Sequence, residues 1–202
     1  MKRRLLLLSL LGAPLAAQAG AQVEEPLADS IRSALGAAIA QSAPPRPRFE
    51  ADQLEARMAY LRWLAAMSER LKKRKTETQI RIEFLETVWY EAKRAGLEPS
   101  LVLGLIQVES GFRKYAISVA GARGYMQVMP FWTRVIGDGD ASRLFHMQTN
   151  LRFGCVILRH YLDVERGNLA LALGRYNGSR GRPEYPNAVF GARRQWLLPG
   201  EM

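Results

Sequence analysis

The 202 residues are enough for one domain with attachments, and a hydrophobic content of 48% excludes wholesale disorder. One cysteine and two histidines exclude an internal disulfide framework and multi-cysteine zinc sites, and they argue against a His-rich metal centre. The net charge of +10 suits an anionic partner but does not choose among nucleic acid, a membrane surface and a cell-wall polymer.

Residues 1–21 have the pattern of an export signal. Residues 2–4 are basic, residues 5–11 are apolar except for Ser9, and Ala17-Gln18-Ala19 has the small-x-small pattern that a signal peptidase needs. The apolar run is shorter than the ~20 residues of a membrane span. We therefore predict a signal peptide and a periplasmic or secreted protein without a stable membrane anchor; the alternative is an uncleaved N-terminal helix. Export also argues against nucleic acid as the partner.

Residues 22–50 are alanine-rich and end in a proline-rich stretch that forces extended backbone, so we predict a linker with a short helical piece at 27–40. Residues 51–76 form a predicted helical extension. Its basic run, Lys72 to Lys75, is interpreted as a solvated face, with a wall- or lipid-binding patch as the alternative. The apolar residues that follow helical spacing, and define the expected buried face, are Leu54, Met58, Leu61, Leu64 and Leu71.

The following residues also have helical patterns. A helix at 78–95 stacks Ile80, Phe84, Val88 and Ala92, and one at 99–110 begins with Pro99 and is apolar nearly all round, so it must be buried. Further helices are predicted at 130–136, 150–164 and 169–176. No stretch shows the alternation of a strand, so the predicted fold class is mostly α.

Glu109 is the acid that needs explaining, because it ends the apolar helix. Burial of a carboxyl group favours its neutral form and raises its pKa toward ~6–7, where it can donate a proton. The alternative is a structural carboxylate satisfied by Arg113 or by backbone amides.

A series of sequence blocks surrounds this acid. In order, they are Glu109-Ser110-Gly111-Phe112, Gly124-Tyr125-Met126-Gln127, Ala172-Leu173-Gly174-Arg175-Tyr176-Asn177-Gly178 and Tyr185-Pro186. This series resembles the catalytic domain of soluble-type lytic transglycosylases, relatives of goose-type lysozyme that cleave bacterial peptidoglycan. The resemblance covers roughly residues 78–194. It implies a lysozyme-like helical domain, which we place at residues 77–198.

The resemblance also implies roles for individual residues. Glu109 matches the single catalytic acid and base, and Tyr176 with Asn177 matches the pair beside it, the tyrosine helping to hold the acid or the intermediate. Ser118 lies near the substrate N-acetyl group, Met126 and Gln127 line the sugar groove, and Tyr185 is a later groove-side element. The chain departs from the common pattern at Tyr125, where leucine is usual, and at Gly174-Arg175, where two alanines are usual.

Structural expectations for four residues accompany these roles. Met126 is open to interpretation as a core residue and Gln127 as a helix cap. Asn150 is expected to cap the helix that it starts. Cys155 is expected to be an inert buried thiol.

Around Glu109 the sequence offers no convincing second carboxylate, although ordinary glycosidases use two. A lone acid favours substrate assistance, as the resemblance implies: cleavage between N-acetylmuramic acid and N-acetylglucosamine with closure of a 1,6-anhydro ring, without metal or cofactor. The alternatives are a lysozyme-type hydrolase using Glu184 or Asp138, and a wall-binding module without activity. The expected partner is peptidoglycan; the sequence does not separate general wall turnover from service to a wall-spanning apparatus.

Overall fold

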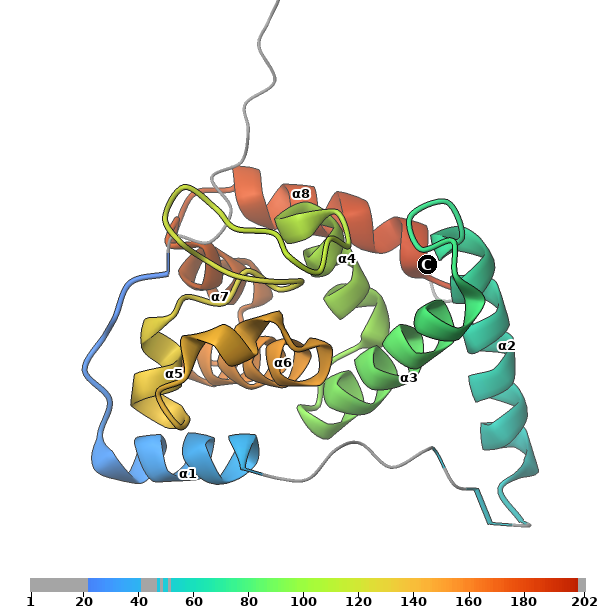
Figure 1. Ribbon diagram of the computed structural model, residues 1–202, viewed down its shortest axis with the longest axis horizontal. Coiled ribbons are helices and arrows are strands. Elements are labelled where there is room, and N and C mark those ends of the chain that lie inside the picture. Colours follow the sequence, from blue (N-terminus) through green and yellow to red (C-terminus); the bar gives the residue numbers. More distant parts are fainter. Residues whose placement is uncertain (1–21, 41–46, 48, 51, 200–202) are drawn as a thin grey trace, which may run out of the picture.

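The computed structural model describes residues 22–40, 47, 49–50 and 52–199 (Figure 1). Within them the chain is mostly α, as predicted, and strand-like pairing is limited to the bridges Ile117–Arg123 and Arg123–Val128. The helices are α1 Asp29–Ile39, α2 Leu54–Leu71, α3 Thr78–Arg94, α4 Pro99–Ser110, α5 Phe131–Ile136, α6 Met147–Val164, α7 Leu169–Asn177 and α8 Glu184–Arg193, with 3₁₀ turns at Ala141–Phe145 and Arg194–Trp196. The helix α8 and both 3₁₀ turns were not predicted from the sequence.

The helix α4 is the centre of the core. Pro99 occupies its first turn, where no amide donor is needed, and Gly111 ends it in the left-handed conformation. Ten of its twelve residues are buried, which confirms the expectation from its apolar surface. Neighbours α3 and α8 cover it, and Figure 1 shows α8 lying across it. Its C-terminal end is therefore held in a fixed frame.

A close approach of backbones fixes α8 against α4. A Cβ atom added at Gly104 would lie 2.7 Å from the backbone nitrogen of Arg193, so only glycine allows this crossing. Further along, Glu109 near the end of α4 meets Tyr185 near the start of α8. The two helices therefore run antiparallel, and the crossing at Gly104 sets how the start of α8 faces the end of α4.

The helix α2 buries a face that overlaps the predicted one only in part. Of the predicted residues, Leu71 is buried and Leu64 is half-buried. Leu54, Met58 and Leu61 are exposed. The buried side chains on α2 are Tyr60, Trp63, Met67 and Leu71. The aromatic side chains are on the buried face because they bury more apolar area than leucine does and pack against other aromatic rings. Trp63 lies 4.7 Å from the ring centre of Trp89 on α3, and Tyr60 lies 5.2 Å from the same ring.

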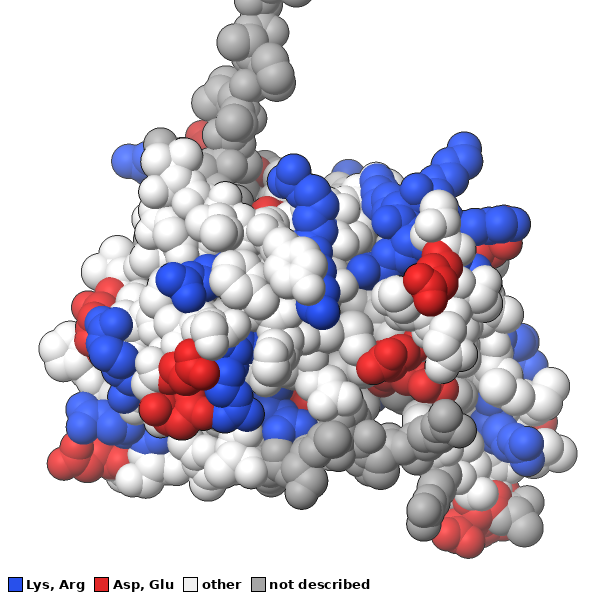
Figure 2. Space-filling view, in the orientation of Figure 1, with Lys and Arg blue, Asp and Glu red and all other residues white. Residues whose placement is uncertain are grey.

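The basic run after α2 is only partly a solvated face. Figure 2 shows basic side chains gathered over the end of α2 and the turn that follows. Lys72 pairs with Glu69 at the surface, as expected for such a face. Lys75, however, is half-buried; its Nζ donates to the Tyr125 hydroxyl at 2.7 Å and lies over the Phe84 ring. Tyr125, where the resemblance leads one to expect leucine, thus contacts the helical extension of residues 51–76.

Residues 22–40, within the predicted linker, pack on the rest of the chain. The helix α1 lies against α5 and α6 although none of its residues is fully buried. Its C-terminal carbonyls are held by arginines: Arg94 donates to Ala38 O and Arg152 to Ile39 O. Most of the proline-rich stretch and the predicted signal peptide lie outside the described residues. No helix in the described part is long and apolar enough to cross a membrane.

Candidate active site

Glu109 lies in the last turn of α4 and is 5% exposed. Burial raises its pKa from the ordinary value to about 8, because a carboxylate loses its hydration there. The Tyr185 hydroxyl donates a hydrogen bond of 2.5 Å to Glu109 Oε1 and acts in the opposite direction, since it favours the carboxylate. The balance leaves an acid that is protonated near neutral pH.

The structural alternative for Glu109 is wrong in one respect. Arg113 turns its Nε to the Ser110 carbonyl at 2.9 Å and forms no ion pair with Glu109. The second carboxyl oxygen, Oε2, is buried and has no hydrogen-bond partner among the described residues. A buried polar atom of this kind normally finds a partner. This oxygen therefore keeps unused hydrogen-bonding capacity within the described part of the chain.

The loop that follows α4 is tied to the core beside this acid. Ser110 Oγ donates to the Tyr125 carbonyl at 2.7 Å. Asn150 Oδ1 accepts from Met126 N at 2.8 Å, and its Nδ2 donates to the carbonyls of Arg123 and Leu144. The expectation that Asn150 caps its helix was wrong, because α6 begins three residues earlier, at Met147. Its side chain braces the loop instead.

Met126 and Gln127, the two predicted groove residues of this loop, direct their side chains to contacts within the protein. Met126 is fully buried, and its side chain packs against Gly154, where an added Cβ would lie 2.3 Å from Sδ. Gln127 has a left-handed backbone with φ of 48°, and its Nε2 donates to Ala116 O and Gly124 O. Both side chains hold the loop. Their part in sugar binding stays a prediction.

The remaining predicted site residues lie around the same loop. Ser118 Oγ accepts from Ala122 N, which closes a turn at its far end. Tyr176 is fully buried, and its hydroxyl donates to Met126 O at 2.7 Å. Asn177 Nδ2 donates to Ser179 Oγ, while its buried Oδ1 has no described partner.

The tyrosine that forms a hydrogen bond with the acid is Tyr185. The role of Tyr176 in holding the acid or the intermediate stays a prediction. Tyr176 is close enough for Glu109 to help burial raise its pKa well above 10, but its hydroxyl goes to the backbone. The sequence placed Tyr185 only generally beside the groove. Its exact role depends on α8, a helix that the sequence did not predict.

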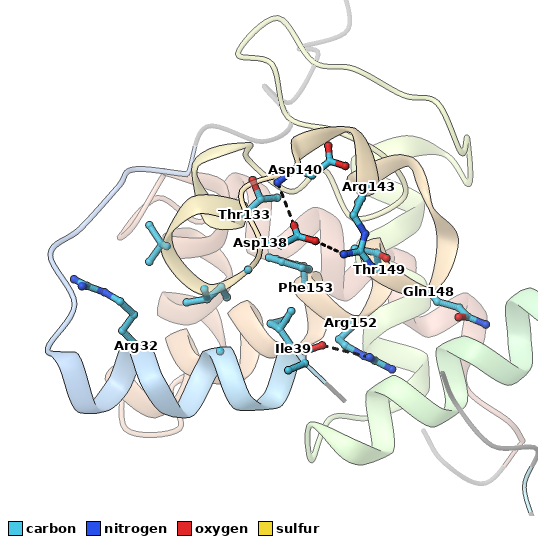
Figure 3. Close-up of a pocket in the computed structure, with 15 residues that line it drawn as sticks. Arg32, Ile39, Thr133, Asp138, Asp140, Arg143, Gln148, Thr149, Arg152 and Phe153 are labelled. Carbon is cyan, nitrogen blue, oxygen red and sulfur yellow. Dashed lines mark hydrogen bonds and ion pairs between the residues drawn. The ribbon is translucent and has the colours of Figure 1, made fainter. Parts of the chain in front are cut away.

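Asp138, one of the two acids considered as a second carboxylate, and Glu165 are each paired with arginine. Asp138 pairs with Arg143 in a cavity of about 640 Å³ between α1, α5 and α6, which contains none of the predicted site residues (Figure 3). Glu165 is held by Arg175 and Arg180, which lower its pKa to about 2. Within the described ranges, no group of three or more His, Cys, Asp or Glu is placed to hold a metal ion.

The remaining acid and the single thiol also stand apart. Glu184 is exposed at the first position of α8. Cys155 is a free, buried thiol, and burial raises its pKa. Neither forms a hydrogen bond with Glu109, whose one side-chain partner in the described part of the chain is Tyr185. The site is built around one acid.

Comparison with known proteins agrees with this geometry. The sequence model of the family described as "Transglycosylase SLT domain" matches residues 86–197, more than half of the chain. The chain therefore belongs to the transglycosylase SLT domain family. The match includes Glu109 and every other predicted site residue.

Two similar curated proteins have the same name. The membrane-bound lytic murein transglycosylase C of Actinobacillus pleuropneumoniae (strain L20) is 40% identical over 84 residues, 38% of this chain and 23% of the relative. That of Haemophilus influenzae (strain PittEE) is 48% identical over 93 residues, 40% and 26%. The matches thus span about a quarter of these relatives. Among solved structures, an inactive mutant of lytic transglycosylase Slt from Pseudomonas aeruginosa has 29% identity and a TM-score of 0.43, covering 70% of this chain and 23% of that one.

Proposed function

We propose that this chain is a peptidoglycan lytic transglycosylase that cleaves the β-1,4 bond between N-acetylmuramic acid and N-acetylglucosamine. The observation that carries the proposal is the buried carboxyl group of Glu109, which forms no ion pair with a described residue and whose pKa of about 8 keeps it protonated at neutral pH. Membership of the transglycosylase SLT domain family and the names of its relatives support the same reaction. We assign catalysis to residues 77–198 and treat residues 51–76 as an extension packed on them.

The proposed reaction needs one protein acid. Glu109 donates its proton to the glycosidic oxygen as that bond breaks, and the N-acetyl carbonyl of the same muramic residue attacks the anomeric carbon. The Glu109 carboxylate then takes the proton of the 6-hydroxyl as O6 attacks the anomeric carbon and releases the acetamido oxygen, which closes the 1,6-anhydro ring. Tyr185 stabilises the carboxylate between the two steps through its hydrogen bond.

The other predicted residues take supporting parts in this proposal. Ser118 and the backbone of the Met126–Gln127 loop lie along the glycan, and Asn177 offers its unpartnered Oδ1 as an acceptor. We place the protein in the periplasm or outside the cell, since its N-terminal pattern is that of an export signal. Its partner is then the peptidoglycan glycan strand.

The test is mass spectrometry of muropeptides released from purified sacculi. The proposal expects products that end in 1,6-anhydro-N-acetylmuramic acid, and Glu109→Gln is expected to lower their release at least about 100-fold. Glu184→Gln, a change of an exposed acid on α8, is the matched control and keeps activity. Products with reducing ends would replace the proposal by a lysozyme-type hydrolase. Glycan binding without any cleavage would leave a wall-binding module.

A further inference from the structure

Residues 22–25, outside the part of the chain matched by the family model, contact the loop at Met129 and the helices α5 and α7. Gln22 is only 4% exposed, and its Oε1 accepts hydrogen bonds from the Trp132 indole Nε1 at 3.0 Å and from Met129 N at 3.4 Å. Two N–H donors from the loop and α5 therefore converge on one amide carbonyl. Its Nε2 is buried without a hydrogen bond of normal geometry to a described residue.

The amide of Gln22 lies beside the buried Tyr176. It faces the hydroxyl of Tyr176 and partly offsets the rise in the Tyr176 pKa. Tyr176 in turn contacts Met126 O and has Glu109 as an electrostatic neighbour. The Gln22 side chain is thus linked through Tyr176 to the loop that contains Met126.

Ion pairs hold this segment in place. Glu25 pairs with Arg175 on α7 at 2.5 Å, and Glu24 pairs with Arg134 on α5 at 3.7 Å. Both acids are about half exposed, and exposed pairs of this kind contribute little free energy. Arg175 is also one of the departures from the common family pattern. A ligand that competes for the same donors can therefore displace the segment.

The Gln22 side chain that accepts from Trp132 Nε1 and Met129 N indicates which chemical group these two donors bind. A glutamine side chain ends in a primary amide, and the sugars of peptidoglycan carry an acetamido group with the same carbonyl. We propose that Trp132 Nε1 and Met129 N bind the acetamido carbonyl of a glycan sugar, and that Gln22 occupies this subsite in the free protein. The subsite rests on the proposed function for its ligand, but binding is measured separately from cleavage.

The direct readout is the indole N–H of Trp132 in a ¹H–¹⁵N NMR spectrum. It is assigned by comparison with Trp132→Phe among the four tryptophans of the chain. Titration of the Glu109→Gln protein with chitotetraose, a soluble oligomer of N-acetylglucosamine, is expected to shift this resonance. Cellotetraose, which has a hydroxyl group in place of each acetamido group, is the matched ligand and is expected to leave it in place.

Two further variants, both made in the Glu109→Gln protein, test the competition. Gln22→Ala is expected to bind chitotetraose at least about threefold more tightly, because the competing amide is absent and the subsite is always free. Asp29→Asn, a change at an exposed residue of α1, is the control and leaves the affinity unchanged. Trp132→Phe keeps an aromatic ring but lacks the donor, and about tenfold weaker binding is expected.

The outcomes separate this inference from the proposed function. A chitotetraose-specific shift of the Trp132 indole, with tighter binding by Gln22→Ala, supports the subsite even if no anhydro product forms. Anhydro products together with an unshifted indole, or with unchanged affinity in Gln22→Ala, would overturn the subsite and leave the enzyme. Because Gln22 lies outside the helices, its replacement tests the idea even if Trp132→Phe does not fold.

Discussion

The hydroxyl of Tyr185 donates a hydrogen bond to Oε1 of Glu109 and so joins the first turn of α8 to the last turn of α4. The bond favours the carboxylate and holds the pKa of Glu109 below the value that burial alone would give. If Glu109 is the general acid, activity falls as pH rises past this pKa.

Tyr185→Phe is therefore expected to move the alkaline limb of the pH–rate profile to higher pH, because the pKa of Glu109 rises further above about 8. The rate at the optimum is expected to fall about 10–100-fold, as for loss of a hydrogen bond to a charged group, worth ~1.5–3 kcal/mol. The measurement is release of anhydromuropeptides as a function of pH. Tyr176→Phe, which removes a hydrogen bond to backbone, is the control. An equal shift in both variants would contradict a direct role of Tyr185.

The face of α2 that packs on α3 is tested by a pair of substitutions. Trp63 is buried and contacts Trp89, whereas Leu61 is exposed on the same helix. Trp63→Ala is expected to lower the free energy of unfolding by about 3–5 kcal/mol, and Leu61→Ala by less than about 1 kcal/mol. Denaturant unfolding measures both. A larger loss from Leu61→Ala would restore the leucine face predicted from the sequence.

The crossing of α4 and α8 makes Gly104 the residue on which the position of Tyr185 depends. Gly104→Ala would press its Cβ against the backbone of Arg193, and we expect a loss of about 1–3 kcal/mol in stability together with reduced activity. Gly36→Ala in α1 is the control: its Cβ would meet the nearest atom at 3.7 Å, and alanine favours a helix. Thermal unfolding is expected to show a lower Tm for the first and an equal or higher Tm for the second. Equal behaviour of the two variants would contradict the tight crossing.

Periodicity and end signals predicted α3 and α4 to within a residue or so, because Pro99 and the apolar run are local properties of the chain. The same reasoning predicted only the Leu64 and Leu71 part of the buried face of α2, since leucine spacing carries no information on the position of Trp89 in another helix. It found the buried acid Glu109 but not the hydrogen bond that tunes it. That bond depends on a long-range crossing at Gly104, and the approach of Gln22 likewise depends on tertiary contacts that no local pattern records.

The raised pKa of Glu109 also makes stability depend on pH. The group has a pKa of about 8 in the folded chain and an ordinary value near 4.5 when unfolded. Between these values the folded state holds a proton that the unfolded state has lost, so the free energy of unfolding decreases as pH rises. Below this window both states are protonated, and above it both are ionised.

Glu109→Gln has no such proton. Its stability relative to the original chain is therefore expected to increase by up to about 1.4 kcal/mol per pH unit between about pH 5 and about pH 8. Urea unfolding of both proteins across this range measures the difference. Asp138→Asn is the control: hydrogen bonds from Asp140 N and Arg143 lower the pKa of Asp138, so its effect on pH dependence is confined to below about pH 4. Parallel curves for Glu109→Gln and the original chain would mean that Glu109 is already ionised at neutral pH in the folded protein, and it would then have no proton to donate to the glycosidic oxygen.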